Sequence, residues 1–326
     1  CDNRYGLVIL NDMKEKLRVF VKISFTPRDV RMLRKDNSLQ VEQKIYSEII
    51  PSMLKHTPNL VEYIFKTNTT DFEKLLNDNV RYIKDHSKFE KKIDEIEKKY
   101  DLGTANFLMV SDQSKNTLLF DWLKKVVVNT NFYELFRQVV TQIAYTLIVF
   151  EEYGLSHNDL HLMNIYIEEL DKETTISLQI GASRYIRFKT KYVVKIFDFD
   201  LGSKSETVLY PEQIINTKLS SGFCKRYGNC NYFFKNQDWF NVMSSMRTVV
   251  AFYKHQRTLT VIDNILGTAL LERMKYPVTN NQYKVGHTVF PGRPCVVAQN
   301  GKALCRHLID ELSLMVTPYQ YITANH

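Results

Sequence analysis

The chain has 326 residues, of which 44% are hydrophobic and 25% are charged, a composition that is ordinary for a globular protein. A chain of this length can bury a sizeable core and has the right size for a two-lobed domain. The longest apolar run, Val139–Phe150, is interrupted by polar groups, so we expect no membrane span.

The formal net charge is +8 and the pI is near 9.0, values that can attract nucleic acid or an acidic substrate. No basic stripe is interleaved with aromatic residues, so we expect lysines spread over a solvated surface and no nucleic-acid binding. None of the five cysteines forms a close C-x-x-C pair, so a zinc ribbon is not expected, and buried or free thiols in a reducing compartment are favoured over a metal site or a disulfide. The first residue is Cys1 rather than Met, so we expect a preceding N-terminal portion.

The N-terminal region predicts a β-hairpin followed by a helix. Tyr5–Leu10 and Leu17–Phe25 alternate in the manner of strands, and the residues between them are polar. From Ser38, a possible cap, hydrophobic residues recur near a 3.6-residue period until Pro51 breaks or bends the helix. Leu60–Lys66 is predicted as a further strand.

A helical insertion is predicted at about residues 69–103, because Asp85–Asp101 is densely charged and carries one hydrophobic stripe. The stripe consists of Phe89, Ile93, Ile96 and Tyr100. A surface helix that packs this stripe is the simpler interpretation. A helix over residues 85–101 that contacts a partner protein is the alternative.

The middle of the chain predicts a short strand, a polar connector and two helices. Phe107–Val110 is the strand, and Ser111–Asn116 is the connector. A helical pattern resumes at Thr117–Lys124. The strongest helix of the chain is Phe132–Phe150, which should end near Gly154.

Beyond Ile165 the pattern is rich in strands as far as Phe199, and from Gln237 it is mainly helical. We therefore expect an α+β fold in which a small β-rich lobe (residues 1–112) and a larger, mainly helical lobe (residues 113–326) face each other across a cleft. The last eighty or so residues carry no motif that we can interpret.

The most specific motif is His157–Asn164, which reads H-N-D-L-H-L-M-N and follows the long helix. Downstream, the hydrophobic strand Tyr192–Phe197 leads into Asp198–Asp200, which reads D-F-D. This order resembles the eukaryotic-like protein kinase family, with its H-R-D-x-x-x-x-N loop, strand and D-F-G. Val19–Lys22 resembles the V-A-I-K strand of that family, and Val41–Tyr46 resembles the casein-kinase-like form of its glutamate-bearing helix.

The resemblance implies a specific role for each of five residues. Lys22 would hold the α- and β-phosphates of ATP, and Glu42 would fix that lysine through an ion pair. Asp159 would accept or orient the proton of the acceptor hydroxyl. Asn164 and Asp198 would hold Mg²⁺, or Mn²⁺ in its place, because hard cations prefer oxygen ligands.

Weaker matches complete the expected nucleotide site. Arg4–Val8 resembles the last part of a glycine-rich phosphate loop, and Val110–Ser114 would be the hinge that binds adenine. The expected nucleotide contacts are Gly6, Val8, Lys22, Glu42, Val110, Ser111 and Gln113. Asp238 resembles the buried aspartate that braces the catalytic loop from a helix, although a helix N-cap is the plainer interpretation.

Four features depart from the family pattern. Asn158 replaces the arginine that reads a phosphorylated activation loop, which suggests a kinase not switched on by that route. His161 stands where many Ser/Thr kinases carry lysine, as in haspin-like, aminoglycoside and choline kinases, and Asp200 replaces the glycine of D-F-G. Asn164 and Asp198 lie thirty-four positions apart, and Leu178–Ile186 with Phe188–Ile196 could form a haspin-like hairpin in that gap. Tyr210–Glu212 comes too soon after Asp198 to be an A-P-E motif.

The sequence thus favours an ATP- and Mg²⁺-dependent Ser/Thr protein kinase acting on an unidentified protein, placed inside the cell, in cytoplasm or nucleus. The alternatives are a small-molecule kinase, which His161 favours, and a pseudokinase scaffold, which Asn158 and Asp200 favour. The insertion and the lysine- and asparagine-rich style resemble kinases of large DNA viruses, in which case the protein could also be packaged in a virion.

Overall fold

The computed structural model describes residues 5–11, 17–27, 42–70, 86–98, 100–112, 116–199, 202–204, 236–274 and 312–326. The chain divides into two compact units: Cys1–Leu39 with Val61–Lys115, and Gln40–Leu60 with Asn116–His326. By compactness, residues 40–60 therefore belong to the second unit. The division at residue 112, which rests on the order of predicted elements, stays a prediction.

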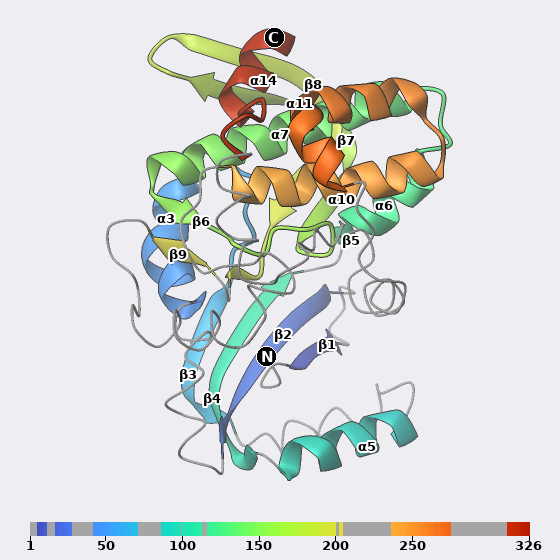
Figure 1. Ribbon diagram of the computed structural model, residues 1–326. Helices are drawn as coiled ribbons and strands as arrows, with labels where there is room; N and C mark the ends of the chain where they lie inside the picture. Colours follow the sequence, from blue (N-terminus) through green and yellow to red (C-terminus); the bar gives the residue numbers. More distant parts are fainter. Residues whose placement is uncertain are drawn as a thin grey trace. The chain divides into compact units, whose positions relative to one another are not determined.

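The first unit is built on a four-stranded antiparallel sheet with the strand order β1-β2-β4-β3 (Figure 1). Its strands are β1 (Tyr5–Asn11), β2 (Leu17–Pro27), β3 (Ile64–Thr70) and β4 (Tyr100–Asp112). The predicted hairpin is confirmed, because β1 and β2 pair over the whole length of β1, from Tyr5 opposite Ile23 to Asn11 opposite Leu17.

The central strand β4 is longer than the sequence predicts. The pattern indicates strand only at Phe107–Val110 and helix as far as Asp101, whereas β4 begins at Tyr100 and the helix, α5, spans His86–Glu97. β4 pairs with a neighbour on each side, and this long-range pairing outweighs the local charge pattern that favours helix. α5 packs against β4 with Ile96 buried, as the simpler interpretation of this helix expects.

The strand predicted at Leu60–Lys66 begins late, at Ile64, where β3 starts. Asn59 and Leu60 contact Ile196 of the second unit instead. Leu60 forms a parallel bridge with Ile196, whose N–H donates to the carbonyl of Asn59 at 2.8 Å. This pairing takes Leu60 away from the sheet of the first unit.

A π-helical turn lies near the start of the described part of the second unit. The chain is helical at Glu42, the first described residue there, and η1 (Ile45–Ile49) leads directly into α3 (Ile50–Met53). The first turn of α3 contains Pro51, which has no N–H to donate and crowds the carbonyl one turn earlier. A wider turn ahead of the proline lets the helix continue where the sequence predicts a break or bend. Ser38 lies outside the described residues.

A long antiparallel hairpin, β7 (Ile165–Ile180) and β8 (Arg184–Ile196), forms a three-stranded sheet with β5 (Asn116–Leu118), in the order β5-β7-β8. The prediction of strands between Ile165 and Phe199 is confirmed, but the predicted turn between Ile186 and Phe188 is wrong. The chain reverses at Gly181, whose φ of 65° is a left-handed conformation that glycine adopts without strain.

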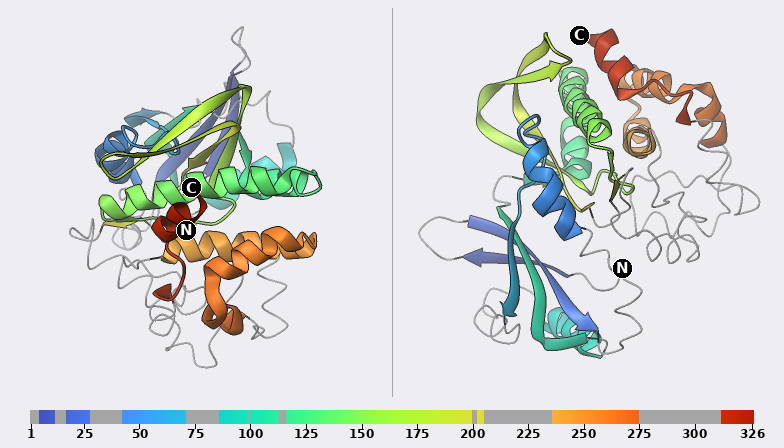
Figure 2. Two further views of the ribbon diagram at one scale, coloured as in Figure 1. Left: turned by 90° about the horizontal axis from the view of Figure 1, so that it is seen from above. Right: turned by 90° about the vertical axis from the view of Figure 1, so that its left-hand side faces the viewer.

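Helices make up most of the described part of the second unit. α6 (Leu119–Val126) begins two residues later than predicted, because the residues before it pair with β7 as β5. α7 (Phe132–Glu152) confirms the strongest helix prediction, and Gly154 follows it with a φ of 62°. Figure 2 shows α7 running beside the β7–β8 hairpin.

The described part of the second unit after Gln237 is mainly helical, as predicted. It comprises α10 (Gln237–Phe252), α11 (Gln256–Met274) and α14 (Pro318–Asn325). α14 packs against α7, and the Trp239 indole N–H donates to the carbonyl of Val316 at 3.0 Å. Within the described ranges, no helix is long and apolar enough to cross a bilayer.

The predicted fold class is confirmed: the chain is α+β, with a small unit built on an antiparallel sheet and a larger unit that is mainly helical.

Candidate active site

The loop His157–Asn164 joins β6 (Leu155–Ser156) to β7 in the second unit. Leu160 and Leu162 are completely buried, so they fix alternate positions of the loop in the core. Asp159 lies just before them and keeps 14% of its side chain exposed. The loop therefore holds its acidic residue near the surface on a backbone that the core supports.

Asp238, in the first turn of α10, holds the start of this loop. Its Oδ2 accepts hydrogen bonds from the His157 backbone N–H at 2.6 Å and from the Ser156 hydroxyl at 3.2 Å. Burial raises the pKa of Asp238 above its usual value, although His157 and the hydrogen bonds act in the opposite direction. Asn236, not Asp238, is the N-cap of α10, so the predicted bracing contact is confirmed over the N-cap interpretation.

His157 connects the loop to the segment that follows β8. Its Nε2 lies 2.8 Å from the carbonyl oxygen of Phe197, and its ring centroid lies 4.7 Å from that of Phe199. The Phe197 N–H in turn donates to the carbonyl of Asn164 at 3.2 Å. Both ends of the loop are therefore joined to residues that flank Asp198.

Asp159 and Asn164 are held together within the loop. The Asn164 Nδ2 donates to the carbonyl of Asp159 at 2.9 Å. His161 Nδ1 accepts the N–H of Met163 at 3.1 Å, which leaves the proton of a neutral ring on Nε2. That Nε2 lies 3.7 Å from Asp159 Oδ2, so a ring proton faces the carboxylate.

Asp198 has a left-handed backbone, with a φ of 69°, which is uncommon for a residue with a Cβ. Its N–H donates to the hydroxyl oxygen of Tyr46 at 3.0 Å. Burial, and then the negative charge of Asp198, raise the pKa of Tyr166 to about 12, so that phenol stays neutral. The Tyr166 ring stacks on Phe197 with centroids 4.1 Å apart.

The residues predicted to hold a metal fit Mg²⁺ or Mn²⁺ by the chemistry of their donors. Because the amide nitrogen of Asn164 donates to Asp159, the amide oxygen is the atom that remains to ligate. Asp198 supplies a carboxylate one residue beyond Phe197, which bonds to Asn164. One carboxylate and one amide oxygen, supplemented by phosphate oxygens, form the kind of set that Mg²⁺ uses in proteins.

Asn158 is buried and is used structurally. Its Oδ1 accepts the Ser156 hydroxyl at 2.8 Å, and its Nδ2 donates to the hydroxyl of Ser203 at 2.8 Å. Ser203 belongs to β9 (Ser203–Lys204), which pairs with β6. Asn158 thus joins the loop to β9. We call Ser156, His157, Asn158, Ser203 and Asp238 the loop-brace cluster.

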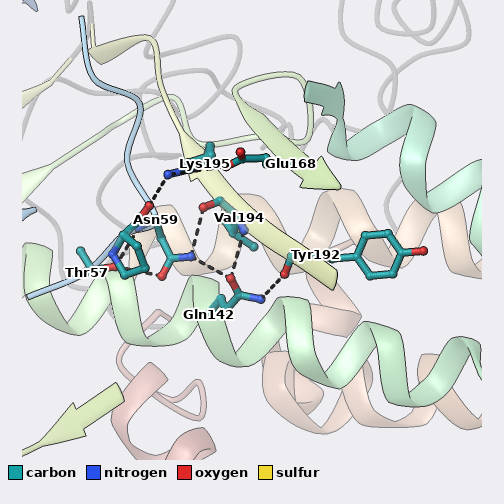
Figure 3. A network of polar contacts seen from close by, with 8 residues as sticks. Thr57, Asn59, Gln142, Glu168, Tyr192, Val194 and Lys195 are labelled. Atoms are coloured by element: carbon teal, nitrogen blue, oxygen red, sulfur yellow. Dashed lines mark hydrogen bonds and ion pairs between the residues drawn. The ribbon is translucent and has the colours of Figure 1, made fainter. Parts of the chain in front are cut away.

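A second polar cluster fixes strand β8, at whose end Asp198 lies (Figure 3). Gln142 Oε1, in the middle of α7, accepts from Asn59 Nδ2 at 2.8 Å and from the N–H of Val194 at 3.0 Å. Gln142 Nε2 donates to the carbonyl of Tyr192 at 2.9 Å. Thr57 donates to Asn59 Oδ1 at 2.9 Å. We call Thr57, Asn59, Gln142, Tyr192 and Val194 the strand-anchor cluster.

The nucleotide contacts expected in the first unit occupy adjoining positions of its sheet. Gly6 lies opposite Lys22, and Lys22 lies opposite Met109. Val8 and Ser111 both lie opposite Phe20, and Val110 lies opposite Val21. Gln113 and Asp200 lie outside the described residues.

Glu42 lies in the second unit and is completely buried. Its ion pair with Lys22 stays a prediction, as do the roles of the other expected site residues.

Three residues that support the site were not identified from the sequence. Tyr46 resembles a core position of an amphipathic helix, and Gln142 resembles a surface position of one. Gly202 packs so closely that an added Cβ would lie 2.4 Å from Ile45 Cδ1 and 3.0 Å from the carbonyl oxygen of Phe199. Of the three, only Gly202 could have been noticed in the sequence, because a lone glycine beside a motif often marks a place where the backbone packs closely against neighbouring atoms.

No family model matches the chain, and no curated protein matches it. Among solved structures, it is similar to the crystal structure of PF14_0431, kinase domain, with 12% sequence identity and a TM-score of 0.38. The similarity covers 99% of this chain and 95% of the other. At this identity and score, the similarity adds nothing to what the loop geometry indicates.

Proposed function

We propose that this protein is a phosphotransferase that moves the γ-phosphoryl group of ATP to a serine or threonine hydroxyl of a protein. The observation that carries the proposal is the double connection between the loop and the Asp198 segment. His157 Nε2 lies 2.8 Å from the Phe197 carbonyl, and the Phe197 N–H donates to Asn164 at 3.2 Å. These bonds support a site that combines Asp159, Asn164 and Asp198.

Asp159 has the position of a group that handles a proton. Its carboxylate is partly exposed, and its backbone carbonyl is held by Asn164. In the proposed reaction the substrate hydroxyl oxygen bonds to the γ-phosphorus and the bond from phosphorus to the bridging oxygen of ADP breaks. The hydroxyl proton passes to Asp159 and then to solvent.

Asn164 and Asp198 would hold Mg²⁺, which when bound neutralises charge on the phosphates. Lys22 would bind the α- and β-phosphates, and Glu42 would orient that lysine. Support for a protein acceptor comes from the casein-kinase-like pattern of Val41–Tyr46.

The test is transfer of label from γ-labelled ATP with Mg²⁺, using a panel of protein acceptors beside choline and an aminoglycoside. We expect label on serine or threonine of a protein, and loss of that label in Asp159→Ala. Label on a small alcohol alone would identify a small-molecule kinase. Absence of nucleotide binding, measured by thermal shift at saturating ATP and Mg²⁺, would favour a scaffold.

A further inference from the structure

Tyr46 contacts two consecutive residues of the Asp198 segment in different ways. Its side chain comes from the π-helical turn η1 and is 4% exposed. Its hydroxyl oxygen accepts the Asp198 N–H at 3.0 Å. Its ring meets the completely buried Phe199 edge-on, with centroids 5.5 Å apart and planes at 86°. One side chain therefore fixes the backbone of Asp198 and the ring that follows it.

The ring of Phe199 has further contacts that keep it in place. Its centroid lies 5.6 Å from that of Phe150 in α7 and 4.7 Å from that of His157 in the loop. Because three elements hold the ring, loss of the Tyr46 hydroxyl alone should not displace Phe199. The hydroxyl and the ring of Tyr46 can thus be tested separately.

The hydroxyl binds a residue whose backbone conformation is uncommon. Asp198 has a φ of 69°, and left-handed conformations are disfavoured for residues with a Cβ unless their surroundings impose them. A hydrogen bond to the N–H of the same residue is one such restraint. Phenylalanine at position 46 would keep the ring contact and remove this acceptor.

We propose that Tyr46 is a positioning residue that holds Asp198 in its left-handed conformation and thereby sets the affinity of the site for the metal–nucleotide complex. This inference rests on the proposed function, because it takes Asp198 as a metal ligand. It goes beyond that function by assigning the positioning of this ligand to a hydroxyl in the π-helical turn η1.

The test compares Tyr46→Phe with Tyr153→Phe. Tyr153 is a matched control, because its hydroxyl donates to the carbonyl of Ser52 at 3.2 Å and so also makes one bond to a backbone atom. We expect Tyr46→Phe to bind Mn²⁺ together with a non-hydrolysable ATP analogue about tenfold more weakly, as loss of one hydrogen bond predicts. Tyr153→Phe should bind within twofold of the wild type, as measured by electron paramagnetic resonance of Mn²⁺.

A second readout needs no ligand. In the protein without nucleotide, the Asp198 amide should be protected from hydrogen exchange, and Tyr46→Phe should exchange it about tenfold faster while Tyr153→Phe leaves it unchanged. Equal exchange in Tyr46→Phe and the wild type would overturn the proposal, as would Mn²⁺ binding by Tyr46→Phe within twofold of the wild type.

Asp198→Ala separates this inference from the proposed function. If Asp198→Ala loses Mn²⁺ binding while Tyr46→Phe keeps it, the role of Tyr46 is wrong and the metal site stands. If Asp198→Ala also binds Mn²⁺ like the wild type, Asp198 is not a metal ligand and both proposals fail.

Discussion

Two buried polar clusters of the second unit differ in what they hold and in what they are made of. The strand-anchor cluster is neutral and uses amide and hydroxyl groups to tie α7 and residues 57–60 to strand β8. The loop-brace cluster contains the carboxylate of Asp238 and supports the loop that carries Asp159. A neutral network suits a fixed scaffold, because it satisfies buried backbone groups without the cost of burying a charge.

The loop-brace cluster buries a carboxylate, that of Asp238, at the point where the loop leaves β6. Asp238 can accept two donors with one oxygen, and both come from consecutive residues, Ser156 and His157. Charge-assisted bonds of this kind are stronger than neutral ones. The comparison suggests that stability depends most on the strand-anchor cluster, and that function and pH response depend most on the loop-brace cluster and its neighbours.

The largest stability effect should come from Gln142→Leu. Leucine has a similar size but leaves the N–H of Val194 and the carbonyl of Tyr192 without their bonds to Gln142. We expect a loss of about 2–4 kcal/mol in the free energy of unfolding, measured by urea denaturation. Gln138→Leu, one turn earlier on α7, should cost less than about 1 kcal/mol. Equal losses in the two variants would mean that the cluster is not a distinct anchor.

Asp198→Ala should abolish stabilisation by ligand while leaving the scaffold intact. For the wild type, ATP with Mg²⁺ at a hundred times its Kd should raise the free energy of unfolding by about 2.7 kcal/mol. The variant should gain almost nothing in a thermal-shift titration. Asp121→Ala removes a half-exposed carboxylate that pairs with Lys124 three residues on, and should respond like the wild type.

Gly202→Ala tests the close packing between η1 and the residue before β9. The new methyl would overlap Ile45 Cδ1, so we expect a loss of about 1–3 kcal/mol. Ile45→Val deletes that atom. The double variant should therefore lose at least about 0.5 kcal/mol less in the free energy of unfolding than the sum of the losses of the two single variants. Strict additivity in the double-mutant cycle would show that the two positions do not clash.

The smallest effect is the pH dependence that Asp238 contributes. The pKa of Asp238 is raised in the folded state. At pH values between the unfolded and the folded pKa, folding is therefore accompanied by uptake of a proton. Stability from this group is therefore fully present below the unfolded pKa and is lost as pH rises through the folded pKa. Relative to Asp238→Asn, the wild type should gain stability as pH falls from 7 toward 4. The opposite slope would mean that the hydrogen bonds lower the pKa more than burial raises it.

Sequence reasoning performs best where a signal is local. The long helix at Phe132, the hairpin at Tyr5 and the loop motif at His157 all follow from periodicity or from a short pattern. The contact of Asp238 with the loop could also be predicted, but only from a resemblance to a known motif, because an acid at the start of a helix is also a common N-cap. These features need no knowledge of what lies far away in the chain.

The rest depends on pairing at a distance. Gln142 bonds to residues 83 positions before it and 52 after it, which no local pattern encodes. Tyr46 meets Asp198 across 152 positions. The turn at Gly181 and the full length of β4 are likewise set by the register of strand partners rather than by propensity.

The most direct test of the account is a single-turnover measurement of phosphoryl transfer by wild type and Asp159→Asn, with enzyme in excess over labelled ATP. Asparagine keeps the shape of Asp159 and removes its ability to accept a proton. We expect the transfer rate to fall by a factor of about 10²–10⁴ while the affinity for ATP and Mg²⁺ stays within about threefold. Transfer by Asp159→Asn within threefold of the wild type would contradict the assignment of His157–Asn164 as the catalytic loop.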